Sequence, residues 1–275
     1  MTKFIIFKRP KMKTVFLPLG DKPISHYPVQ YAIEISAALG ATLIVSRLYR
    51  EDARSRGLLK GNLTVAEISS QEIQKELENF ELKGDYKIIP VEGDDLIEAV
   101  AKFHQKENID LIVLPPRHQD IHEAYFLGSV SGGFVKKTDI PALIVPEGYG
   151  FKPVKNILMA IKSGIIKDEK VLLPLEDIMK AEDAIVRLLQ VKTPDYLPED
   201  SEFNEVLGKL ISAYKSSENA TLFQGLLEHL NENYPDMLCV FRRKRGFFTK
   251  LWEESRIKKS DFESRIPLLV LKEAE

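Results

Sequence analysis

Gly128, Ser129 and Ser131 are residue types that together could bind an anion. They follow an apolar run at residues 109–114, after a polar connection, and they open a segment with helical spacing. Glycine allows a backbone N–H group to approach a phosphate closely, and the N-terminus of a helix adds a partial positive charge. We therefore take Gly128, Ser129 and Ser131 as a candidate site for a small anion or a phosphate. A simpler explanation is that Ser129 is only the N-cap of the helix.

A second candidate is the basic segment that runs from Arg242 to Lys259. It contains eight basic residues against two acidic ones, and Phe247, Phe248 and Trp252 lie among them. Such a surface could bind an anion, a nucleic acid or an acidic protein partner. The alternative is a solvated loop whose aromatic side chains pack on the edge of a sheet. We keep the segment as a candidate contact for an unknown protein partner.

Catalytic and metal-binding patterns are weak in this sequence. We find no combination of nucleophile, base and orienting group and no suitable pair of carboxylates, so we expect no catalytic residue. His118 and His122 have a metal-like spacing, but they lie in a predicted loop without a nearby cysteine, and we expect no metal site. Gly132 and Gly133 lie inside the predicted helix, where we expect them to permit close helix packing. These observations favour a binding protein over an enzyme and leave the question of activity open.

The elements that must position these residues occur twice along the chain. Apolar runs that begin at Asp110 and Ile140 recur as runs that begin at Asp236 and Ile266, 126 residues later in both cases. Two β-type runs at one spacing, found twice, indicate two similar domains in tandem. The 275 residues divide into two units of ordinary domain size. We place the boundary in the segment 147–153, which contains glycine and proline, and expect domains at 1–150 and 151–275.

Apolar runs alternate with helical patterns in both halves. The first half has predicted strands at residues 14–19, 42–45, 86–91, 109–114 and 141–145. Continuous apolar strands separated by helices are typical of a parallel sheet with helices on both faces, and right-handed crossovers then give a doubly wound sheet. The second half repeats the pattern with a shorter middle. There the sequence predicts a helix over 203–214 and a strand over 220–224.

Composition excludes some classes of protein. The net charge of −2 and the pI of about 6.3 give the whole chain no bias toward nucleic acids or acidic membranes. Cys239 is the one cysteine and lies in an apolar run, so a disulfide framework is impossible and a reducing compartment is expected. No stretch approaches 18 consecutive apolar residues. We expect a cytoplasmic protein that does not associate with a membrane.

Four blocks of the first half together resemble the universal stress protein family. They are VFLP at 15–18, IDLIVL at 109–114, LGSVS at 127–131 and IPALIV at 140–145. In the second half, PDMLCV at 235–240 and IPLLVL at 266–271 are similar to the blocks of the family. RRKRGFF at 242–248 resembles the degenerate second domain of bacterial tandem members. The resemblance implies two tandem, doubly wound, parallel five-stranded α/β sheets of the adenine nucleotide alpha hydrolase-like fold.

The resemblance also implies a dimer formed by pairing the last strands of two copies. Here residues 141–145 and 267–271 could pair within one chain and make an intramolecular pseudo-dimer. A final apolar strand at the edge of a sheet needs a partner or a cover, which agrees with this arrangement. Further dimerisation is left open.

Many members of the family bind ATP through a loop of pattern G-x2-G-x9-G-S/T. Alignment on Gly128 places His118 and Pro115 at the two earlier glycines. Proline has no N–H group to donate to a phosphate, and only Gly128 and Ser129 remain of the pattern. In the second half the position of Gly128 is taken by Glu254, whose carboxylate would repel a phosphate.

The acidic residue that the family has after its first strand is also missing. It aligns with Gly20 in the first half and with Lys162 in the second. We therefore expect a non-catalytic, cytoplasmic stress-response binding or regulatory module, without family-type ATP binding and without a cofactor. The alternative is an ATP- or AMP-binding member with slow ATP hydrolysis, using a rearranged loop around Arg117, Gly128 and Ser129.

Overall fold

The structure is a computed structural model that describes residues 11–20, 26–51, 63–116, 125–127, 129–242, 257–258 and 265–272. The elements of the first half are β1 (Thr14–Leu19), α1 (His26–Leu39), β2 (Thr42–Tyr49), α3 (Val65–Leu77), β3 (Tyr86–Ile88), β4 (Val91–Glu92), α4 (Leu96–Glu107), β5 (Leu111–Leu114), β6 (Tyr125–Leu127), α5 (Ser129–Lys137) and β7 (Ala142–Ile144). Those of the second half are β8 (Asn156–Ile161), a 3-10 turn (Glu169–Leu172), α6 (Leu173–Glu182), β9 (Ile185–Lys192), a 3-10 turn (Pro198–Ser201), α7 (Glu205–Leu210), β10 (Ile211–Glu218), α8 (Leu222–Asn233), β11 (Met237–Arg242), β12 (Ile257–Lys258) and β13 (Leu268–Lys272).

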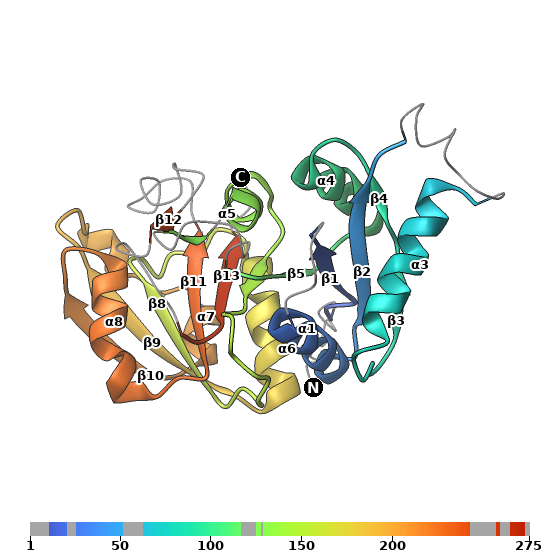
Figure 1. Ribbon diagram of the computed structural model, residues 1–275. Helices are drawn as coiled ribbons and strands as arrows, with labels where there is room; N and C mark the ends of the chain where they lie inside the picture. Colours follow the sequence, from blue (N-terminus) through green and yellow to red (C-terminus); the bar gives the residue numbers. More distant parts are fainter. Residues whose placement is uncertain are drawn as a thin grey trace, which may run out of the picture.

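The two halves have the same sheet topology (Figure 1). The strand order is β3-β2-β1-β5-β7 in the first half and β10-β9-β8-β11-β13 in the second, and the neighbours within each half are parallel. Each order therefore turns at the first strand of its half, as in a doubly wound sheet. The predicted fold class of two parallel five-stranded α/β sheets is confirmed.

The two sheets join through their last strands. β7 and β13 pair antiparallel, with Ile144 opposite Leu268, Leu143 opposite Leu269 and Ala142 opposite Val270. This contact makes one continuous sheet, so neither final strand is left as an open edge. The predicted pairing within one chain, and with it the intramolecular pseudo-dimer, is present.

The repeated aspartates fix the start of the first strand in each half. One carboxylate oxygen of Asp110 accepts hydrogen bonds from the backbone N–H groups of Lys13 and Thr14, at 2.8 and 3.0 Å. Asp236 accepts from the two corresponding N–H groups at the start of β8, at 3.0 Å each. N–H groups at the end of a strand have no ladder partner of their own, so a carboxylate from the neighbouring strand satisfies them. The repeat detected in the sequence thus has a structural cause.

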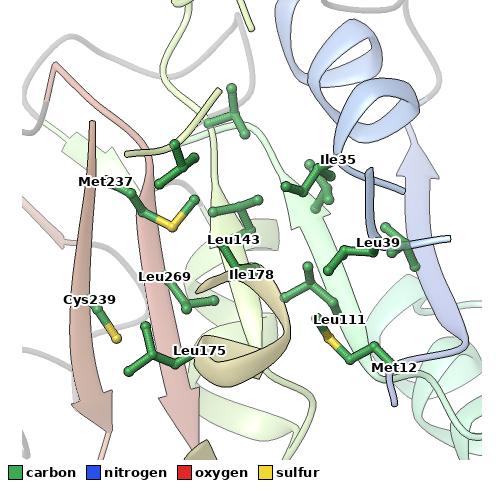
Figure 2. Packing of buried hydrophobic residues seen from close by; sticks show 14 of the residues in the cluster. Met12, Ile35, Leu39, Leu111, Leu143, Leu175, Ile178, Met237, Cys239 and Leu269 are labelled. Atoms are coloured by element: carbon green, nitrogen blue, oxygen red, sulfur yellow. The ribbon is translucent and has the colours of Figure 1, made fainter. Parts of the chain in front are cut away.

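One hydrophobic cluster continues from the first half into the second. In Figure 2, Leu143 and Leu269 of the two paired strands lie beside Leu175 and Ile178 of α6. A buried hydrogen bond also crosses between the halves, from the N–H group of Met12 to Asp177 of α6 at 2.6 Å. A second cluster covers the opposite face of the sheet, under α4, α5 and α8. Because both clusters contain residues of both halves, the sheet is enclosed on its two faces as one unit.

The sequence prediction was wrong in the middle of the second half. The predicted helix over 203–214 is only the short α7, and its second part is the strand β10. The predicted strand at 220–224 is the start of α8, whose N-cap Thr221 accepts a hydrogen bond from the N–H group of Gln224 at 3.0 Å. β10 lies at the edge of the sheet and is exposed along most of its length, so its sequence carries no apolar run.

Among the described residues, no helix has the length and apolar character needed to cross a membrane.

Candidate functional site

The candidate anion residues lie at the start of α5, on the chain that leaves β5. Ser129 is the first residue of this helix and is exposed, whereas Gly128 lies outside the described residues. Ser131 is buried, and its hydroxyl group donates a hydrogen bond to the carbonyl oxygen of Pro115 at 2.7 Å. Ser131 therefore lies at the end of β5, but its hydroxyl proton is used in a hydrogen bond to the backbone.

The hydrogen bond between Ser131 and Pro115 limits the donors available to a ligand at the end of β5. Pro115 has no N–H group, and its carbonyl oxygen faces the hydroxyl group of Ser131. A phosphate at the end of β5 would face the carbonyl oxygen of Pro115, which is an acceptor, and the hydroxyl group of Ser131, whose proton is already in a hydrogen bond. Of the candidate residues that are described, Ser129 is the one with an exposed side chain. Arg117 and His118 lie outside the described residues.

Gly133 explains how close α5 lies to α4. A Cβ atom at this position would be 2.2 Å from Cδ1 of Ile97, which is much closer than two carbon atoms can approach. The prediction that a glycine of this helix permits close packing is thus confirmed at Gly133.

The other end of α5 is held by cations that come from the second half. Nζ of Lys272, the last residue of β13, donates to the carbonyl oxygens of Phe134, Val135 and Thr138 at 2.8, 2.7 and 2.7 Å. Arg242, the last residue of β11, donates to the carbonyl oxygen of Lys136. Lys272 is 6% exposed, and burial lowers the pKa of its ammonium group well below the usual value. Sequence analysis missed this contact.

In the second half, an ion pair bridges the loops after the first two strands. Nζ of Lys162, directly after β8, lies 2.7 Å from a carboxylate oxygen of Asp195, in the loop after β9. Thr193 donates to the other oxygen of that carboxylate at 2.6 Å. Lys162, and after it Thr193, holds the pKa of Asp195 below its usual range. Lys162, which the sequence resemblance aligns with the acidic residue of the family, is therefore a cation that is paired with Asp195.

The loop after β8 also contacts the segment at residues 202–204. The N–H group of Asn204 donates to the carbonyl oxygen of Gly164 at 3.2 Å, and Gly164 forms a β-bridge with Phe203. A Cβ atom at Gly164 would be 2.5 Å from the carbonyl oxygen of Glu202, so the close approach requires glycine. The described loops after β8 and β9 are thus joined by intramolecular contacts.

The predicted basic surface is described in part. Arg242 is half-buried and directed toward α5, and Lys258 belongs to β12, which pairs antiparallel with β6. Residues 243–256 and 259 lie outside the described residues, so the role of this segment as a partner contact stays a prediction. The β6–β12 pair joins the connections that follow β5 and β11 in the two halves.

Metal-binding side chains do not gather in the described part of the chain, where no group of three or more His, Cys, Asp or Glu residues could hold an ion. His118 and His122 lie outside it. Cys239 is a buried free thiol on β11, and burial raises its pKa, which keeps it protonated and unreactive.

Residues 11–146 match the family model of the universal stress protein family. Through this half, the chain belongs to the universal stress protein family. The matched residues extend from just before β1 to just after β7, and they include the candidate serines. No curated protein matches the chain at a significant level.

Solved structures share the fold of the entire chain. A universal stress protein from Archaeoglobus fulgidus DSM 4304 is 17% identical with a TM-score of 0.61, covering 96% of this chain and 98% of its own. A putative universal stress protein from Pseudomonas aeruginosa UCBPP-PA14 is 13% identical with a TM-score of 0.58, covering 95% of this chain and 93% of its own. At these identities the similarity concerns the fold alone.

A universal stress protein in complex with cAMP aligns with 50% of this chain and 100% of its own, at 18% identity and a TM-score of 0.37. This similarity is too low to transfer a ligand.

Proposed function

We propose that this universal stress protein is a non-catalytic, cytoplasmic binding or regulatory module of a stress response, and that it does not bind ATP in the manner of many family members. The hydrogen bond from Ser131 to the carbonyl oxygen of Pro115 is the observation that carries this proposal. Phosphate sites of this type use backbone N–H groups as donors. Here the residue after β5 has none, and the nearest buried hydroxyl group is already engaged.

The second half supports the same conclusion. A nucleotide in a doubly wound sheet lies outside the carboxyl ends of the strands. In this half, the ion pair between Lys162 and Asp195 bridges the loops at the ends of β8 and β9. A ligand would have to separate these charges or bind elsewhere. The second copy is therefore proposed to act as a structural partner of the first.

Isothermal titration of the full chain with ATP and Mg²⁺ tests the proposal. We expect no heat of binding at micromolar concentrations of ATP. Binding with a micromolar dissociation constant would defeat the absence of family-type ATP binding, while the regulatory role would then have to include the nucleotide.

The alternative is an ATP- or AMP-binding protein, and one observation favours it. Ser129 is exposed at the first turn of α5, where the helix N-terminus favours an anion. Mass spectrometry of the denatured protein should then detect copurified ATP or AMP. Ser129→Ala should lower the occupancy, whereas Ser70→Ala, on the distant helix α3, should leave it unchanged. An empty protein, or equal occupancy in both variants, would remove this alternative.

A further inference from the structure

The last turn of an α-helix leaves carbonyl oxygens without a partner inside the helix. In α5 these oxygens are bonded to the second half of the chain. Lys272 donates to the carbonyl oxygens of Phe134 and Val135 in α5 and of Thr138 directly after it. Arg242 donates to that of Lys136. Both residues are the last ones of strands, β13 and β11, so the sheet of the second half determines where the two cations lie. Figure 1 shows α5 next to the end of β13.

The ammonium group of Lys272 is fully used in this contact. It has three protons and three carbonyl acceptors at 2.7–2.8 Å, and the side chain is buried. Arg242 and Asp139 are the charged groups that act on it, the first opposing its charge and the second favouring it. Removal of the ammonium group would take this donor from the buried carbonyl oxygens of Val135 and Thr138, which is costly in a site closed to water. The carbonyl oxygen of Phe134 would keep the N–H and hydroxyl groups of Thr138 as donors.

The matching positions of the first half cannot make such a contact in the other direction. The residues 126 positions before Arg242 and Lys272 are Pro116 and Pro146, and neither has a side chain that can donate a hydrogen bond. The two halves are therefore not equivalent partners. The second half supplies cations to a helix of the first, and the first returns none from the matching positions.

We propose that Lys272 and Arg242 form a latch by which the second half holds α5 in place, so that α5 is stable only while β13 is paired with β7. The latch gives the second half a conformational role although its own glycine loop is lost. It also links the pairing of the halves to the helix whose first turn carries Ser129. The latch does not depend on whether an anion binds at that turn.

Hydrogen exchange of the unmodified full chain at increasing denaturant concentration tests the latch directly. The amides of residues 133–138 should exchange in the same opening as those of β13, with the same denaturant dependence, because the two elements lose their bonds together. Exchange of α5 through a separate, lower-energy opening, with β13 still protected, would overturn the proposal.

Two variants of the full chain then separate the latch from general stability. Lys272→Met keeps the apolar stem and removes the ammonium group, and it should speed exchange of residues 133–138 by about tenfold or more. Exchange of β9 and β10 should increase less than that of residues 133–138, because these strands do not depend on the latch. Arg242→Met removes the donor to a single carbonyl oxygen, that of Lys136. It should give a smaller increase in the exchange rate, confined to the last turn of α5.

The matched control is Lys215→Met. Lys215 also lies on a strand of the second half, but it is exposed and pairs with Glu232 on α8, far from α5. It should leave the exchange of α5 unchanged. Equal acceleration in all elements, or no acceleration in α5, would show that Lys272 is not a latch. If Lys272→Met does not fold, the unmodified chain and Arg242→Met decide the question.

Discussion

Asp110 and Asp236 show how a single residue can make a repeat visible in a sequence. Each accepts two backbone N–H groups at the start of the first strand of its half. The aspartate before β5 and its counterpart before β11 are needed because β1 and β8 start beside them. The aspartate that opens each of these apolar runs is therefore explained by a bonding requirement, in addition to the apolar character of the strands.

This requirement gives a prediction for Asp110. Asp110→Ala should lower the free energy of unfolding by about 1–3 kcal/mol, because two N–H groups lose a charged acceptor. Asp236→Ala should have an effect of the same order. Urea denaturation measures both, and Asp94→Ala, whose side chain is 95% exposed, serves as the control with a change within about 0.5 kcal/mol. Equal losses of stability in Asp94→Ala and Asp110→Ala would show that the hydrogen bonds of Asp110 to β1, here called the aspartate clamp, do not stabilise the fold.

His104 predicts a dependence of stability on pH. Its Nδ1 atom accepts a hydrogen bond from the N–H group of Ile109 at 2.9 Å, which a protonated ring cannot do. Burial lowers the pKa of His104 below 6.5, although Asp110 and Asp139 act in the opposite direction. The folded protein thus binds this proton less readily than the unfolded chain. The contribution is complete above pH 6.5 and is lost as the pH falls below that value.

Unfolding experiments at pH 7.5 and 5.5 measure this effect in the unmodified chain and in His104→Gln. The variant cannot titrate at this position, so its stability should fall less between the two values. An identical fall in both proteins would show that His104 does not contribute.

At the scale of elements, apolar strands were predictable and polar ones were not. β5, β7 and β13 are buried at every position, and β11 is buried at every position except Arg242. Apart from the basic residues that end β11 and β13, these strands appear in the sequence as continuous apolar runs. β10 is an edge strand that pairs with β9 and is mostly exposed. Its residues do not have to be apolar, because they do not face the hydrophobic core. The site followed the same rule. The helix start at Ser129 was readable from local sequence, whereas the partner of its other end, Lys272, is contributed by a distant strand.

The loop after β8 allows a prediction at this scale. Gly164→Ala should destabilise the protein by about 1–3 kcal/mol, because the new methyl group would be 2.5 Å from the carbonyl oxygen of Glu202 and the segment would have to move. Gly208→Ala is the control. It lies within α7 with no atom within 4 Å of the added Cβ, so it should stabilise by about 0.5–1 kcal/mol. Thermal unfolding measures both, and a neutral Gly164→Ala would show that the loop is not tightly bound to residues 202–203.

In the whole molecule, the two halves share their strand order more clearly than their sequence. The family model covers residues 11–146, yet the second half has the same strand order and the same aspartate clamp. A strand tolerates any apolar residue of suitable size, whereas a phosphate loop requires glycine at fixed positions. Substitutions in one copy can therefore erase the glycine motif while the sheet, which the other copy needs as a partner for β7, remains.

The seam between the halves leads to a last prediction, that the chain unfolds as one unit. β7 and β13 lie side by side at the centre of the continuous sheet, and the hydrophobic cluster around Leu143, Leu269 and α6 belongs to both halves. Separation of the halves would expose this cluster and free the backbone groups of two buried strands. Calorimetry should therefore show a single transition whose van't Hoff and calorimetric enthalpies agree.

Leu143→Ala probes the seam because the residue is fully buried on β7. It should lower the stability by about 2–5 kcal/mol and move the single transition to lower temperature without splitting it. Ile73→Ala, equally buried but on α3 away from the seam, should act in the same way, since one cooperative unit responds alike to a loss in either place. Two resolved transitions in the unmodified chain, or a split in Leu143→Ala alone, would mean that the halves are stable separately and that their pairing is an added contact between independent domains.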